Sequence, residues 1–311
     1  MPDVLTLGEA MGALRAHRPL HLGGTLDLSV AGAEANVAIG LARLGHRARW
    51  VGVTGADEFG RLVLRTLRAE GVDVSHAAVD DSAPTGLVVF EQRVADLTRV
   101  CYYRGGSAGS RLAPVHLVAA LAEGARIVHL TGVTAALGPS CYQAVEAAAR
   151  ADALICLDVN YRAKLWPPDR ASTALRPLVR QVDVLVASDD ELSLVCPPGA
   201  DTEARQVRAL LDEGVREVVV KRGADGAEVF TAAGSVSRPA IRVPVKDTVG
   251  AGDAFVAGYL SGLLDELPLP ERLDRAVATG AFAVAAAGDW EGLPFRGELD
   301  LLHAVPGSTL R

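Results

Sequence analysis

The sequence predicts a doubly wound α/β fold, in which helices flank a mostly parallel sheet, and three observations predict it. Short apolar runs typical of buried parallel strands alternate with helical segments along most of the chain. Polar residues follow several of these strands at the carboxyl end, where such sheets bind ligands. The chain has 311 residues, 50% hydrophobic and 22% charged, which is enough for a large buried core, so we expect one domain over 1–311.

The alternation defines the expected elements in chain order. Glycines close several of the helices, and Asp57 is a candidate N-cap for the second one. The segment 227–243 is again rich in strand-forming residues. The expected strands cover 4–9, 48–53, 126–130, 153–159, 183–187 and 217–221, and the expected helices cover 33–44, 57–69, 117–122, 140–151, 170–179, 189–196, 202–212, 251–264 and 273–287.

One part of the chain breaks this alternation. The runs 86–91 and 98–103 are strand-like and are joined by a polar loop without a helix, which is typical of a hairpin. The segment 20–30 contains glycines and partly alternates, so it is also expected to be extended. Together these extended segments predict a small β-sheet lid formed by about 12–31 and 84–108.

Composition excludes several classes of function. The net charge is −7 and the pI is about 5.5, so a nucleic-acid surface is not expected. The four cysteines form no CxxC pair and no zinc-like cluster with histidine. No apolar run reaches membrane-spanning length and no signal peptide is expected at the amino terminus, so we expect a cytoplasmic protein without membrane contact.

The segment 247–253 predicts an anion site next to a base. A strand-rich region ends before it and a long apolar helix begins within it, so backbone N–H groups of a helix start converge there. Gly250 and Gly252 allow close approach of a phosphate to the backbone, and the N–H group of Ala251 lies between them in the predicted site. Asp253 would repel that anion unless it takes a proton from an attacking hydroxyl. The alternative is an ordinary helix start with Asp in the first turn.

Three other strand ends carry polar residues and are candidate ligand sites. Glu191 either holds Mg²⁺ through water or complements a helix dipole. The turn 221–226 either holds a nucleotide phosphate or is a plain hairpin turn. No GxxxxGK[ST] and no early GxGxxG occurs, so ATP would need another architecture. The candidates at these ends are Asn160, Arg162, Ser188, Lys221, Arg222, Gly223 and Gly226.

Other residues predict how a substrate is bound. Asn36, one turn into a helix, either contacts a sugar hydroxyl or caps the helix. Tyr102 and Arg104 share one face of a lid strand, where an arginine is suited to a carboxylate. Arg162 is a second candidate, and two convergent arginines would imply an anionic substrate. The alternative is a pair of solvated surface arginines.

The chain resembles the PfkB (ribokinase-like) carbohydrate kinases over essentially its whole length. The run DTVGAGDAFVAGYL from Asp247 matches their carboxy-terminal signature. The amino-terminal signature is matched less well, since its glycine doublet is Ala31-Gly32 here and Glu34 replaces a small residue. Within the family the chain looks most like the branch of 2-keto-3-deoxygluconate kinases, on the runs GAEAN from Gly32, YYRGGSAGS from Tyr102, LDVNYR from Leu157 and GDWEG from Gly288.

The resemblance implies an enzyme that uses ATP and Mg²⁺ to phosphorylate a sugar acid and that forms a homo-oligomer, a dimer or higher. A tyrosine that some members carry is Val88 here and a basic residue is Gly105, which affects the expected substrate preference. Alternatives are a kinase of fructose, ribose or another keto-deoxy acid, and a non-catalytic sugar or nucleotide sensor. The sugar-acid contacts implied are Gly32, Tyr102, Arg104, Arg162, Asp253 and Asp289; the nucleotide contacts are Asn160, Ser188, 221–226 and 250–252.

Overall fold

The structure, a computed structural model, describes residues 1–94 and 97–303. Its main sheet has the strand order β14-β13-β12-β11-β10-β9-β1-β4. All neighbours from β4 to β12 are parallel, and β13 and β14 extend the sheet as antiparallel strands. The strands are β1 (Val4–Leu7), β4 (Ala48–Val51), β9 (Ile127–Thr131), β10 (Leu154–Asp158), β11 (Val184–Ser188), β12 (Glu217–Lys221), β13 (Ala227–Thr231) and β14 (Gly234–Arg238).

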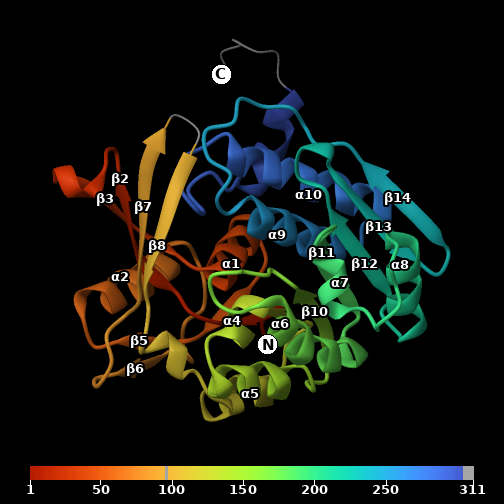
Figure 1. Cartoon of the computed structure of the whole chain (residues 1–311), viewed down its shortest axis with the longest axis horizontal. Coiled ribbons are helices and arrows are strands. Elements are labelled where there is room, and N and C mark those ends of the chain that lie inside the picture. The colour runs from red at the N-terminus through yellow and green to blue at the C-terminus, as the bar shows by residue number, and fades with distance from the viewer. Residues whose placement is uncertain (95–96, 304–311) are drawn as a thin grey trace.

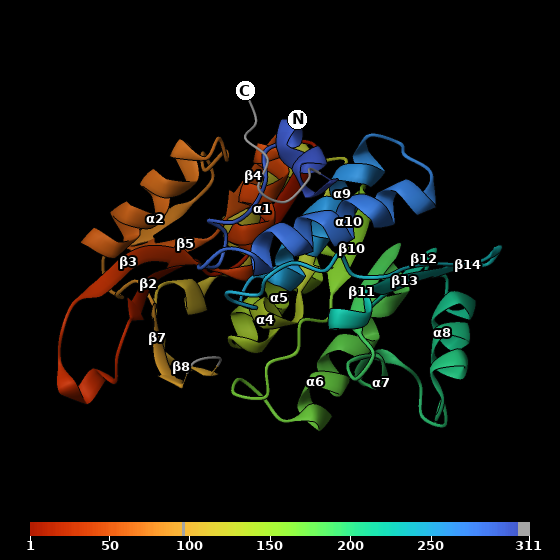
Figure 2. The same ribbon diagram turned by 90° about the horizontal axis from the view of Figure 1, so that it is seen from above.

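Helices cover both faces of this sheet (Figures 1 and 2). Successive residues of a strand point to opposite faces: Ile155 and Leu157 of β10 pack in one apolar core, and Cys156 between them packs in the other. The first core contains side chains of α3 (Val118–Glu123), α4 (Gly132–Ala136), α5 (Pro139–Ala148), α6 (Pro168–Leu175), α7 (Leu192–Val195) and α8 (Glu203–Asp212). The second contains those of α1 (Ala33–Arg43), α2 (Glu58–Ala69), α9 (Ala251–Leu264) and α10 (Leu269–Val284).

A second, four-stranded sheet lies beside the main body (Figure 1). We call it the small sheet. It has the order β3-β2-β7-β8, and the expected hairpin is confirmed as β7 paired antiparallel with β8. Phe59 of α2 packs against Gly12 on its outer face. The strands are β2 (Met11–Ala16), β3 (Leu26–Ala31), β7 (Leu87–Val94) and β8 (Leu97–Tyr103).

Several elements differ from the sequence prediction. The run 48–53 is two strands, because β5 (Val53–Gly55) leaves the main sheet and pairs with β6 (Ala78–Asp80). Gly52 allows this, since a Cβ there would lie 2.1 Å from the Trp50 ring and 2.4 Å from the Gly8 carbonyl oxygen. Strand β2 and helix α4 were not expected, and the helix predicted over 189–196 is only the single turn α7. No helix in 1–94 or 97–303 is long and apolar enough to cross a membrane.

Candidate active site

The turn before α9 is the segment at which the sequence predicts an anion site. Gly250 is the N-cap of α9 with a φ of 74°, a left-handed conformation that favours glycine. A Cβ there would lie 1.9 Å from the carbonyl oxygen of Asp289. A Cβ on Gly252 would face open space, with the ammonium of Lys221 as the nearest atom at 3.7 Å. Gly250 is therefore required by the protein's own packing, whereas Gly252 leaves room for a ligand beside the Lys221 ammonium.

Asp253, in the first turn of α9, is held by two amides. Its Oδ2 accepts a hydrogen bond from Asn36 (2.8 Å), and its Oδ1 accepts one from Asn160 (3.2 Å). Burial raises the pKa of Asp253 to about 6, against the opposing effects of the Asn36 hydrogen bond and the Arg162 charge. Asp253 is therefore ionised at neutral pH and titrates close to it, which suits a general base. The capping interpretation of Asn36 is wrong, because Gly32 is the N-cap of α1.

Asn160 connects the base to a buried ion pair. Its amide also donates to Asp158 (3.3 Å), and Asp158 accepts from the Lys221 ammonium at 2.8 Å. The backbone of Asn160 has a φ of 39°, a conformation that asparagine tolerates better than most residues and that is often found at functional sites. The ends of β10 and β12 therefore present one connected polar network to Asp253.

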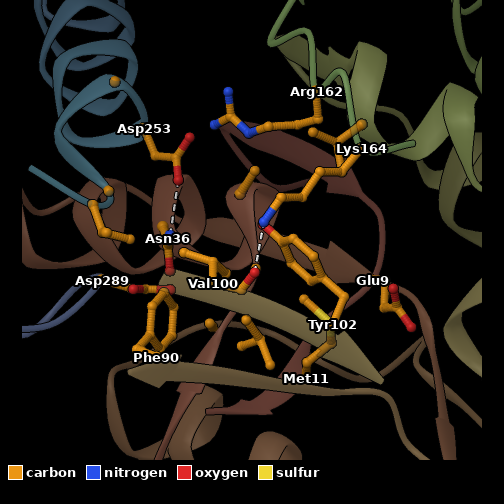
Figure 3. Close-up of a pocket in the computed structure, with 18 of the residues that line it drawn as sticks. Glu9, Met11, Asn36, Phe90, Val100, Tyr102, Arg162, Lys164, Asp253 and Asp289 are labelled. Carbon is orange, nitrogen blue, oxygen red and sulfur yellow. Dashed lines mark hydrogen bonds between the residues drawn. The ribbon is translucent and has the colours of Figure 1, made fainter. Parts of the chain in front are cut away.

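A cavity of about 470 Å³ lies between the small sheet and the ends of the main-sheet strands (Figure 3). The small sheet contributes an apolar floor, including Met11, Val88, Phe90 and Val100. Substrate residues expected from the sequence are brought together around it. Of that set the lining contains Gly32, Asn36, Tyr102, Arg104, Arg162, Asp253 and Asp289, together with Gly250 and Gly252.

Arg104 has a buried partner that the sequence analysis missed. Its guanidinium forms an ion pair with Glu9, which also accepts a hydrogen bond from the Ser107 hydroxyl. Arg104 also lies over the Tyr102 ring, 5.5 Å from its centroid. Arg162 is exposed, donates to the carbonyl of Tyr161 at 3.2 Å and extends toward Asp253 (Figure 3). The two arginines therefore line one cavity, but Arg104 is already neutralised.

Asp289 is the second buried carboxyl group in the cavity. Burial raises the pKa of Asp289 to about 8, and the nearby Asp253 charge contributes. Its Oδ1 is buried without a hydrogen-bond partner and lies 3.8 Å from Arg15, which pairs with Asp247 at 2.7 Å. A neutral carboxyl group at this position can donate a hydrogen bond to a substrate oxygen.

The remaining residues predicted to bind Mg²⁺ or the nucleotide make several contacts within the protein itself. Glu191 accepts hydrogen bonds from the backbone N–H groups of Tyr161 (2.6 Å) and Ser188 (2.8 Å), so it ties the segments after β10 and β11 together. The segment 221–226 connects β12 to β13 as a hairpin, with Gly223 at its turn. Arg222 there is paired with Glu203 and Glu228. The positive charge of the Arg222 guanidinium is therefore already neutralised by carboxylates of the protein.

Glu34 is a buried acid whose environment the sequence did not reveal. It is fully buried, and its Oε1 accepts hydrogen bonds from the hydroxyls of Thr131 and Thr134. Burial raises the pKa of Glu34 to about 7. Gly8 makes room for it, because a Cβ at Gly8 would lie 2.3 Å from the carboxyl group. Through these contacts Glu34 connects the start of α1 to the ends of β1 and β9.

Comparison with known proteins identifies the family. The family model of pfkB family carbohydrate kinases matches residues 1–296. The chain belongs to this family. It is 41% identical to the 2-dehydro-3-deoxygluconokinase of Thermoproteus tenax over 98% of this chain and 95% of that protein, and 36% identical to the enzyme of the same name from Bacillus subtilis over 96% and 94%.

The fold agrees with this assignment. A putative ribokinase II from E. coli, solved in complex with ATP and Mg²⁺, matches 97% of this chain and 99% of its own with a TM-score of 0.90 and 25% sequence identity. The predicted ribokinase-like, mostly parallel α/β sheet is thus confirmed. As a member of the pfkB family, the protein is an ATP-dependent carbohydrate kinase.

Proposed function

We propose that this pfkB-family kinase transfers the γ-phosphoryl group of ATP to the terminal hydroxyl of 2-keto-3-deoxygluconate, giving the 6-phosphate. The observation that carries the proposal is Asp253, a buried carboxylate held by Asn36 and Asn160 at the wall of a cavity that arginines also line. The likeness to two kinases named for 2-dehydro-3-deoxygluconate, a synonym of this acid, supports the same substrate.

In the proposed step the substrate hydroxyl oxygen bonds to the γ-phosphorus as the bond to the ADP oxygen breaks. Asp253 accepts the hydroxyl proton, a role worth roughly 10²–10⁴ in rate. The first N–H groups of α9, at Gly250, Ala251 and Gly252, have no intrahelical partner and face the charge that develops on the phosphoryl oxygens. Lys221 adds a positive charge beside Gly252. Exclusion of water by the small sheet, the proposed lid, limits ATP hydrolysis.

The residues near Asp253 also fit Mg²⁺ as a companion of ATP. The Oδ1 of Asn160 is buried without a hydrogen-bond partner, and oxygen ligands are what Mg²⁺ prefers. Mg²⁺ that accompanies ATP is commonly held by one or two protein oxygens together with phosphates and water. Asn160 and, through water, Glu191 would hold it. The bound ion would neutralise phosphate charge.

A coupled ADP-release assay tests the proposal. The substrates are 2-keto-3-deoxygluconate, its C4 epimer, fructose and ribose, each with ATP and Mg²⁺. We expect the highest kcat/KM with a keto-deoxy acid. A higher kcat/KM with fructose or ribose would replace the proposal with a neutral-sugar kinase. Measurable sugar binding without ADP release from any of them would instead indicate a sensor.

A further inference from the structure

Among the side chains that the structure describes, three cationic ones line the cavity, and their charges are not equivalent. Arg104 is paired with the buried carboxylate of Glu9, so its charge is largely neutralised before any substrate enters. Arg162 and Lys164 bond only to neutral carbonyl oxygens in the hydrogen bonds that the structure shows for them. The positive charge available to a new anion therefore comes from the loop after β10, not from Arg104.

Lys164 connects that loop to the small sheet. Its Nζ donates a hydrogen bond to the backbone carbonyl of Val100 in β8 at 2.6 Å. An ammonium has three N–H donors, so two remain for a ligand. The side chains of Val100 and Tyr102, on the same face of β8, line the cavity with Lys164. In Figure 3 the ammonium lies on the Tyr102 side of the cavity.

Arg162 serves a different part of the cavity. Its side chain extends toward Asp253 in Figure 3, and its positive charge lowers the pKa of Asp253 against the larger effect of burial. A group at that position acts on the reacting end, where the phosphoryl group is transferred. The substrate carboxylate is at the opposite end of the sugar acid, five carbons from the terminal hydroxyl. Lys164, on the β8 side, is placed for that end.

We propose that Lys164 determines specificity by binding the carboxylate of the sugar acid while it holds the edge of β8. This inference rests on the proposed function, because it assumes an anionic substrate. The carboxylate accepts hydrogen bonds from the two remaining N–H donors of the ammonium. Such a charge-assisted bond is stronger than a neutral one.

The test compares two substrates that differ only in the carboxylate. They are 2-keto-3-deoxygluconate and 3-deoxyfructose, in which a hydroxymethyl group replaces the carboxylate. We expect Lys164→Met to raise KM for the acid at least tenfold, to change kcat less than threefold and to leave KM for 3-deoxyfructose within twofold. Lys164→Gln, which keeps neutral donors for Val100, should behave like Lys164→Met, and Lys164→Arg should restore most of the affinity.

Arg99→Met is the matched control. Arg99 precedes Val100 in β8 but faces away from the cavity, where it lies 3.8 Å from Glu91. This variant removes a cation from the same strand, so it should leave KM for the acid within twofold. Titration calorimetry with the acid and a non-hydrolysable ATP analogue gives the affinity independently of turnover.

Three results would overturn the inference about Lys164. If KM rises equally for both substrates, Lys164 only fastens the small sheet. If KM for the acid stays within twofold in Lys164→Met while the wild type prefers the acid, the carboxylate is bound elsewhere and the proposed function survives. If the wild type itself does not prefer the acid to 3-deoxyfructose, the proposed function fails and the carboxylate role of Lys164 fails with it.

Discussion

Asp253 is the residue on which the proposed chemistry depends most. Its two carboxylate oxygens accept hydrogen bonds from Asn36 and Asn160. An asparagine side chain at this position has only one oxygen, so it could accept only one of these two bonds in the same geometry. We expect Asp253→Asn to lower kcat at least a hundredfold, because the amide cannot accept the proton. Circular dichroism and thermal melting should show a folded protein. Turnover within tenfold of the wild type would exclude Asp253 as the base.

The raised pKa of Asp253 also predicts a pH dependence. The base must be ionised to accept a proton, and burial raises its pKa to about 6. We therefore expect kcat to be constant above pH 7 and to fall about tenfold per pH unit well below pH 6. Initial rates at saturating substrates from pH 5 to 8 measure this limb. A profile flat down to pH 5 would contradict the assignment.

Glu34 predicts a pH dependence of stability. The folded protein keeps its proton up to a pKa of about 7, whereas the unfolded chain loses it near 4.5. Between these values the folded state binds more protons, so the free energy of unfolding falls as pH rises, by an amount on the order of 3 kcal/mol. Glu34→Gln removes this titration. Urea unfolding at pH 5 and pH 8 should show a smaller loss in the variant than in the wild type.

At the scale of elements, the turn before α9 is constrained by the loop after α10. Gly250→Ala would place a methyl group 1.9 Å from the Asp289 carbonyl oxygen at a left-handed φ. We expect a loss of stability of about 1–3 kcal/mol and a loss of kcat, because the N–H groups of α9 would shift. Gly297→Ala is the control, since a Cβ at Gly297 meets nothing within 4 Å. Equal melting temperatures for the two variants would contradict this argument.

The sequence predicted those features that a short stretch of chain encodes. The turn from Gly250 to Asp253 could be predicted because a strand-rich region, glycines and an apolar helix follow one another within a few residues. The pair of Glu9 with Arg104 could not, because its partners are far apart in the chain and each looks like an ordinary charged residue. Strand β2 was missed because its residues, Met11–Ala16, show little alternation of polar and apolar side chains.

For the whole molecule, the outer face of the small sheet predicts self-association. Leu28 on β3 is 54% exposed, and Leu26 and Tyr103 on the same face are 41% and 64% exposed. Because burial of such a surface is favourable, we expect a dimer or higher oligomer that buries it. Light scattering after gel filtration should show that Leu28→Lys shifts the protein to smaller species. A wild type that is monomeric at all accessible concentrations would contradict this prediction.

The closure of the anion turn by Asp289 also has a consequence for synthesis on the ribosome. Gly250 packs against the Asp289 backbone, and the Gly288 N–H lies 3.5 Å from the Asp247 carboxylate. The residues that complete the turn are thus translated after α10. A nascent chain that ends before Gly288 lacks the backbone against which Gly250 packs and the N–H group that contacts Asp247. The anion turn can therefore take its final form only after residue 289 has been added to the chain.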